Sequence, residues 1–232
     1  MPTEPEMPLL AADFAAPEAM TAWIEAGLAA LGGLRPSAEL LRSVAAHEAP
    51  VGPPSGRLGR HGDASFRRFV AAAFLADLAS YPAPVDQVDF ARLLYVMHVF
   101  PRGFRVWSAE VPGFGRLPVG YTAWVPIAET SFERLEKQAS TLRDRMVVPL
   151  PEVEEGGYLY LFNFSIVPAL RGTEAARRLV KRYAEDVGAQ GARGLAAITV
   201  SEDGMRVVGR FGLRRSGSLV IDGAEEFVYT RR

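Results

Sequence analysis

The chain has 232 residues, of which 49% are hydrophobic and 23% are charged, and its formal net charge is −1. This is the composition of a globular protein with one or two domains. The balanced charge gives no electrostatic reason to expect nucleic acid as a partner. Cysteine is absent, which excludes disulfides, a cysteine nucleophile and thiolate metal ligands. We expect no metal cofactor, because the three histidines are scattered along the chain: His47, His61 and His98.

Residues 1–62 are rich in Ala and Pro and predict a helical and loop extension. One helix is expected after Pro17 and should end at Gly32-Gly33, and a second should begin at Pro36-Ser37. The first residues, Met-Pro-Thr-Glu-Pro-Glu, have neither the basic nor the apolar stretch of a secretory signal. No apolar run approaches the roughly 20 residues that span a bilayer. We therefore expect a cytoplasmic protein without a transmembrane segment.

Residues 63–232 predict one domain of alternating helices and strands. Its first helix is capped by Asp63 or Ser65 and ends at Tyr81-Pro82. The pattern then predicts a helix over 86–99, strands over 104–111 and 117–125, a helix over 130–145, a strand over 158–167, a helix over 173–187, a strand over 194–200, a helix over 202–211 and a hairpin over 219–229. This order predicts an α/β, or α+β layered, domain in which helices flank a mixed sheet.

The junction between the strand over 158–167 and the next helix carries the clearest chemical signal. The first turn of a helix offers free backbone N–H groups and a positive dipole end, which together bind anions. Small residues there let a phosphate approach the backbone. The predicted phosphate-binding residues are Val167, Arg171, Gly172, Thr173, Glu174, Ala175 and Ala176. The alternative is an unrelated βαβ unit in which Arg171-Gly172 is only a turn.

This junction resembles the acyl-CoA motif of the GNAT acyltransferase superfamily, Val-x-Pro-x-x-Arg-Gly-x-Gly-x-Gly/Ala. The residues that fit are Val167, Arg171, Gly172 and Ala176. Pro168 stands one residue early, and Glu174 occupies the position of a glycine. Residues 207–213 resemble the second GNAT signature, a helix that closes in Gly-Phe, with Gly212 in place and Leu213 instead of Phe.

The resemblance implies a GNAT-like mixed sheet and an N-acyltransferase. Its donor substrate would be acyl-CoA or acyl-phosphopantetheine on a carrier protein, and its acceptor would be an amine. Two positions depart from the pattern. The tyrosine that protonates the leaving thiolate in many relatives aligns with Val208, and their acidic residue early in the central strand aligns with Tyr158.

Residues 104–129 have a fainter resemblance to bacterial toxin-activating lysine acyltransferases, carried by Pro118-Val119-Gly120-Tyr121-Thr122-Ala123-Trp124. That GNAT-fold family takes fatty acyl groups from acyl-carrier protein and attaches them to lysine side chains. It relies on a histidine well before the hairpin, and none lies at the matching distance here. It also uses an aspartate in the central strand, where Asn163 and Ser165 are the nearest polar residues.

Four residues are candidates for catalysis. Asn163 and Ser165 interrupt one face of an otherwise apolar strand, and they either line the reaction cleft or bond to backbone. His98 could accept a proton from the amine, or it is a histidine at a helix end. Glu129 could take the same role, or it caps a helix in solvent.

A basic cluster follows the predicted phosphate turn and consists of Arg177, Arg178, Lys181 and Arg182. It is either a solvated helix face or a docking surface for an acidic acyl-carrier protein. Glu174 would oppose the diphosphate of CoA more than the single phosphodiester of a carrier arm, which favours the carrier. Two other functions stay open: a non-catalytic GNAT-like binding module, and an N-acyl amino acid or acyl-homoserine-lactone type of synthase.

Overall fold

The computed structural model describes residues 17–50, 63–137, 144–221 and 224–232. In these residues the strands form a seven-stranded mixed sheet of order β1-β2-β3-β4-β5-β7-β6. The chain divides into two compact units. The first comprises Met1–Leu93, Phe104–Tyr121 and Ser165–Arg177. The second comprises Leu94–Gly103, Thr122–Phe164 and Arg178–Arg232. The expected class, a layered domain with a mixed sheet and helices, is confirmed.

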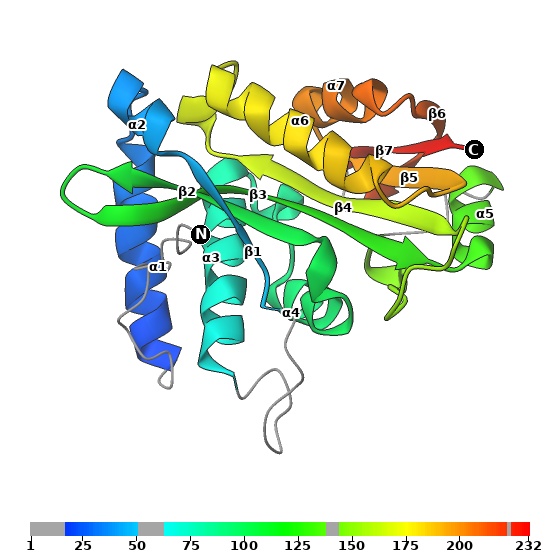
Figure 1. The fold of residues 1–232 in the computed structure, drawn as a ribbon, viewed down its shortest axis with the longest axis horizontal. Coiled ribbons are helices and arrows are strands. Elements are labelled where there is room, and N and C mark those ends of the chain that lie inside the picture. Colours follow the sequence, from blue (N-terminus) through cyan, green and yellow to red (C-terminus); the bar gives the residue numbers. More distant parts are fainter. Residues whose placement is uncertain (1–16, 51–62, 138–143, 222–223) are drawn as a thin grey trace. The chain divides into compact units, whose positions relative to one another are not determined.

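The helices of the first unit begin where the sequence predicts. Ser37 caps α2 (Ala38–Ser43), accepting a hydrogen bond from the Leu40 N–H at 3.1 Å. Asp63 caps α3 (Ala64–Ser80), accepting from the Ser65 N–H at 2.8 Å. Helix α1 (Pro17–Gly32) lies beside α3 (Figure 1), and a Cβ on its Gly27 would stand 2.5 Å from Leu75 Cδ2. The glycine therefore permits this close approach.

Strand β1 (Ala45–Glu48) was not expected from the sequence. It pairs antiparallel with β2 (Phe104–Val111), and Ala45 stands opposite Ser108. Two side-chain contacts strengthen the pairing: His47 Nε2 lies 2.7 Å from Ser108 Oγ, and Glu48 forms a 2.9 Å ion pair with Arg105. Burial, helped by the charge of Arg116, lowers the pKa of His47. Part of the predicted extension thus belongs to the sheet.

Strand β3 (Gly115–Ile127) follows β2 and extends beyond the predicted range of 117–125 at both ends. Gly113 and Gly115 adopt positive φ angles of 80° and 77° in the connecting turn, a conformation that costs other residues more. Helix α4 (Phe90–Val99) begins four residues later than predicted. Its delay has a local cause, because the Val88 N–H donates to the Asp77 carboxylate at 2.8 Å instead of entering a helix.

The remaining elements agree closely with the predicted order. They are α5 (Glu129–Lys137), β4 (Tyr158–Ile166), α6 (Glu174–Gly188), β5 (Gly194–Thr199), α7 (Glu202–Arg210), β6 (Arg214–Ile221) and β7 (Ala224–Arg231). Short 3-10 helices cover Pro84–Asp86, Pro101–Gly103, Asp144–Met146 and Pro168–Leu170. The helix expected over 130–145 is observed only to Lys137, and residues 138–143 lie outside the described part of the chain. Strands β5, β7 and β6 lie side by side (Figure 1).

Candidate functional site

Strands β4 and β5 are parallel, and their pairing stops before either strand ends. The register runs from Tyr158 opposite Gly194 to Leu161 opposite Ala197. Strand β4 nevertheless continues to Ile166, and β5 continues to Thr199. On its other side β5 stays paired with β7 as far as Thr199. The pairing of β4 with β5 therefore ends at Leu161 and Ala197, before either strand ends, and the two strands part beyond this pair.

Two polar side chains lie where β4 and β5 part. Asn163, a predicted catalytic residue, is half-buried on β4. Thr199 ends β5 with only 6% of its surface exposed, and its Oγ1 has no hydrogen-bond partner among the described residues. Thr199 was not among the residues predicted from the sequence, because threonine is common in strands. Its one visible signal was a hydroxyl at the end of an apolar strand.

Ser165, the second member of the predicted polar pair, is tied to the neighbouring strand. It is 1% exposed, and its hydroxyl oxygen accepts the Tyr121 N–H at 3.3 Å. The Tyr121 hydroxyl in turn donates to the fully buried Asp77 carboxylate at 3.1 Å. The alternative reading, a polar side chain bonded to backbone, therefore describes Ser165 in this structure. Its place in a reaction cleft stays a prediction.

The turn after β4 is held by Arg171 and shaped by Gly172. The Arg171 guanidinium donates to the Ser80 carbonyl at 2.6 Å and to the Ile166 carbonyl at 3.4 Å. Gly172 has a φ of 74°, and a Cβ there would meet no atom within 4 Å. The Val167 N–H donates to the Val119 carbonyl at 2.9 Å. The Val167 amide is therefore already engaged, and open space lies beside Gly172.

The first turn of α6 carries the other predicted phosphate-binding residues. Thr173 caps the helix: its hydroxyl donates to the Leu170 carbonyl at 2.6 Å and accepts the Ala176 N–H at 3.4 Å. Glu174 is exposed at the first helical position, and Ala175 is buried behind it. This capping uses one of the N–H groups that a helix start leaves over for an anion.

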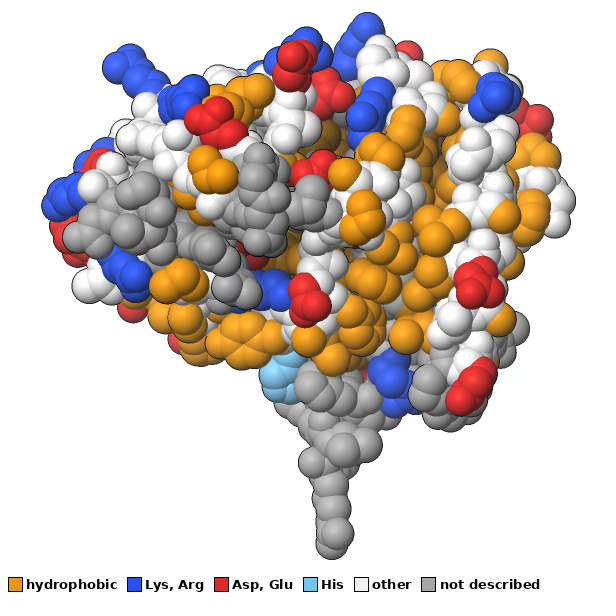
Figure 2. Space-filling model, turned by 180° about the vertical axis from the view of Figure 1, so that it is seen from behind, with side chains coloured by type: hydrophobic (Ala, Val, Ile, Leu, Met, Phe, Trp, Pro, Cys, Tyr) orange, Lys and Arg blue, Asp and Glu red, His pale blue; other side chains and the backbone are white. Residues whose placement is uncertain are grey.

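The basic cluster on α6 is largely paired within the chain. Arg177 reaches back to the turn and donates to the Gly172 carbonyl at 3.5 Å. Lys181 lies 3.9 Å from Glu185, and Arg182 forms a 3.1 Å ion pair with Asp186; Arg178 also lies on this helix. In Figure 2, which views the molecule from behind, hydrophobic side chains gather in the middle of the visible face and charged side chains lie mostly towards its rim. Because these contacts offset part of the positive charge of the cluster, they do not indicate a strong positive field there.

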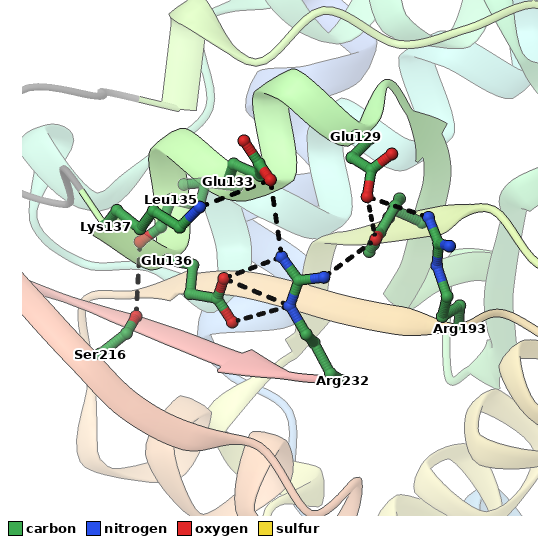
Figure 3. A network of polar contacts seen from close by, with 9 residues as sticks. Glu129, Glu133, Leu135, Glu136, Lys137, Arg193, Ser216 and Arg232 are labelled. Carbon is green, nitrogen blue, oxygen red and sulfur yellow. Dashed lines mark hydrogen bonds and ion pairs between the residues drawn. The ribbon is translucent and has the colours of Figure 1, made fainter.

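Glu129 lies at the opposite end of β4 from Asn163. Its carboxylate accepts the Tyr158 hydroxyl at 2.6 Å and pairs with Arg193 at 3.0 Å (Figure 3). The Tyr158 hydrogen bond, followed by the charge of Arg193, lowers the pKa of Glu129, and the same bond raises the pKa of Tyr158. Five residues of strand separate the backbones of Tyr158 and Asn163, which is about 16 Å. The structure therefore does not bring Glu129 and Asn163 together.

His98, the remaining candidate base, is half-buried in the last turn of α4.

No group of three or more His, Asp or Glu side chains suited to a metal ion occurs among the described residues. In the same part of the chain, no helix has the length and apolar character needed to cross a membrane.

The sequence matches no protein-family model and no curated protein. Solved structures, in contrast, share its fold. The NatC complex bound to Gag peptide and CoA aligns with a TM-score of 0.50 at 10% identity, covering 81% of this chain and 97% of that one. The loading GNATL domain of CurA from Lyngbya majuscula aligns with a TM-score of 0.50 at 14% identity, covering 69% of this chain and 91% of that one. The chain therefore has the fold of the GNAT acyltransferase superfamily.

Proposed function

We propose that this protein transfers an acyl group from a thioester donor to an amine. The observation that carries the proposal is the opening between β4 and β5 after the Leu161–Ala197 pair, within a GNAT fold. An extended donor arm placed there would lie along the part of β4 that continues beyond its pairing with β5. The similar NatC structure contains CoA and a peptide, which supports a thioester donor and an amine acceptor for this chain.

In this proposal the donor phosphate binds at the Gly172 turn. The positive φ of Gly172 and the open space beside it let an anion approach the backbone. The amino terminus of α6 and the nearby guanidinium of Arg177 supply partial and full positive charge. Positioning of the amine against the thioester then supplies most of the rate acceleration, with backbone N–H groups stabilising the oxyanion.

The carrier of the acyl group is either CoA or the phosphopantetheine arm of an acyl-carrier protein. Exposed Glu174 next to the turn favours the carrier arm, which has one phosphate fewer at this place. Docking at Arg177, Arg178, Lys181 and Arg182 is the second part of this idea. The ion pairs of Lys181 and Arg182 weaken it, because Glu185 and Asp186 already offset their charge.

A direct comparison of the two donors tests this choice. If a carrier protein is the donor, its transfer rate should exceed that of acyl-CoA, fall with added salt, and drop when Arg178 and Arg182 become Glu. Equal or faster transfer from acyl-CoA, insensitive to salt, would assign CoA. A panel of lysine peptides, free amino acids and homoserine lactone as acceptors would separate protein acylation from a small-molecule synthase.

A binding module without turnover is the second candidate function. It is favoured by Val208, which is buried and apolar where many GNAT enzymes carry the tyrosine acid. Calorimetry and turnover with the same acyl thioesters separate the two candidates. Binding without transfer to any amine in the panel would assign the module.

Matched glycine substitutions test the phosphate turn. Gly172 and Gly191 both have positive φ, 74° and 61°, and a Cβ on either meets no atom within 4 Å. Ala at either position should therefore cost similar stability, roughly 1–2 kcal/mol for the left-handed conformation. We expect only Gly172→Ala to weaken donor binding, by roughly tenfold, or 1.4 kcal/mol. Equal donor affinity of the two variants would place the phosphate elsewhere.

A further inference from the structure

The hydroxyl of Thr199 is buried without a hydrogen-bond partner among the described residues. The residue as a whole is only 6% exposed. Burying a hydroxyl without a partner destabilises a folded protein, and a valine of the same shape would avoid that penalty. An isolated buried hydroxyl therefore points to a partner that binds from outside the chain.

Thr199 lies at the place where the sheet opens. The last pair between β4 and β5 is Leu161 with Ala197, and continuing this register by two residues sets Asn163 opposite Thr199. On the other side Thr199 is held opposite Phe227 of β7. Its backbone is therefore fixed by one neighbouring strand while the side towards β4 has no partner.

The first turn of helix α7 covers Thr199. A Cβ on Gly204, in the first turn of α7, would stand 3.4 Å from Thr199 Cβ. The Ser201 hydroxyl already accepts the Gly204 N–H at 3.1 Å as the helix cap. Val208 lies one turn beyond Gly204 on the same face of the helix and is buried and apolar. The Thr199 side chain thus packs against the first turn of α7, at the end of β5 beyond its last pair with β4.

We propose that the Thr199 hydroxyl donates a hydrogen bond to the thioester sulfur of the acyl donor. This inference rests on the proposed acyl transfer. The amine nitrogen attacks the thioester carbonyl carbon, the new C–N bond forms, and the C–S bond breaks with its electron pair on sulfur. The hydroxyl stabilises this charge and keeps its own proton. The proton lost by the amine passes to water, and the thiolate takes one from water.

The hydroxyl atom is covered in the unliganded chain, so the side chain must move slightly to meet the donor. Rotation about the Cα–Cβ bond moves the hydroxyl to another of the three staggered positions. This rotation needs no change in the backbone, which β7 holds in place. Donor binding should therefore select a second rotamer of Thr199.

The substitutions Thr199→Val and Thr199→Ser test the role. Valine keeps the shape and removes the hydroxyl, so the melting temperature should stay equal or rise, while kcat should fall at least tenfold. Serine keeps the hydroxyl and should retain kcat within about threefold, the scatter expected for single interactions. Thr230→Val is the matched control, because Thr230 is also buried but stands opposite Ala196, in the paired part of β5. Its kcat should equal that of the wild type.

Three results would overturn the inference. A lower melting temperature for Thr199→Val, with kcat unchanged, would make the hydroxyl structural. If the wild type is active and Thr199→Val has the same kcat, the proposed role of the hydroxyl is wrong, but the proposed acyl transfer remains intact. A wild type that neither binds nor turns over any acyl thioester would remove both. A fall in kcat with an equal or raised melting temperature supports the inference.

Discussion

The two ends of β4 differ in how they are held. At its beginning, Tyr158 is paired with Gly194, stacked on the Phe132 ring at 4.5 Å, and hydrogen-bonded to Glu129. Arg232 adds a further contact, donating to the Tyr158 hydroxyl at 3.3 Å. Four residues beyond Tyr158 the pairing with β5 has ended, and Asn163 follows. One end of the strand is saturated with contacts, and the other is open on one side.

This difference indicates that one end of β4 serves the stability of the fold and the other end serves binding. A Cβ on Gly194 would stand 2.6 Å from the Tyr158 ring, so the closed end has no spare volume. The open end instead keeps a buried hydroxyl, that of Thr199, for which the described part of the chain offers no hydrogen-bond partner. Binding sites commonly carry such costs, which the rest of the fold offsets. Substitutions at the closed end should therefore change stability, and those at the open end should change activity.

The largest effect is expected for Phe132→Ala at the closed end. Phe132 is fully buried on α5 and stacks on Tyr158. Removing a buried aromatic ring costs roughly 3–5 kcal/mol of unfolding free energy, measured by chemical denaturation. Donor affinity per folded molecule should not change. Lost donor affinity in the folded fraction would show that the two ends are coupled.

Effects of intermediate size are expected for alanine substitutions of Asn163 and Ser165, and the two should differ in whether stability or kcat falls. Ser165→Ala removes the hydroxyl that accepts the Tyr121 N–H, so it should cost roughly 0.5–1.5 kcal/mol of stability with kcat nearly unchanged. Asn163→Ala should lower kcat more than stability. Melting temperatures and specific activities of both variants decide the matter. If Ser165→Ala were fully stable but inactive, Ser165 would belong to the reaction cleft.

The smallest effect concerns pH and Glu129. Hydrogen bonding by Tyr158 lowers the pKa of Glu129 below its ordinary value of 4.5, so the folded state binds fewer protons than the unfolded state. Its contribution to stability is present above about pH 4.5 and is lost as pH falls through the lowered pKa. Glu129→Gln should lower the melting temperature slightly at pH 7, and this difference should shrink as pH falls below 4.5. A difference that does not change with pH would rule out the carboxylate charge as its cause.

The sequence predicts most of the element order because hydrophobic periodicity and helix caps are local signals. Asp63 shows this, since the residue named as a helix cap makes the capping bond. Strand β1 could not be predicted, because Ala-Ala-His-Glu has no apolar alternation and its stability comes from β2, about 60 residues away. Tertiary pairing, rather than propensity, forms that strand.

The candidate site was predictable only in its chemistry. The Arg171-Gly172 turn was visible through its resemblance to the GNAT motif, and Asn163 was visible because it interrupts one face of an otherwise apolar strand. The point where β4 and β5 part could not be predicted from the sequence. Leu161 and Ala197, the last paired residues, are apolar residues of the kind found throughout strands. The contact between Glu129 and Tyr158 joins residues 29 positions apart, and no local pattern records it.

Strand β1 also protects the protein from association. It is the edge of the sheet and covers β2 with four residues, one of them the charged Glu48. A chain shortened to begin at Asp63 would leave the eight residues of β2 as the edge, including Val106 and Trp107. A long apolar edge with unpaired backbone groups is a template for strand addition between molecules. With Ala45–Glu48 in place, a four-residue strand that ends in a charged residue forms this edge instead of the eight residues of β2.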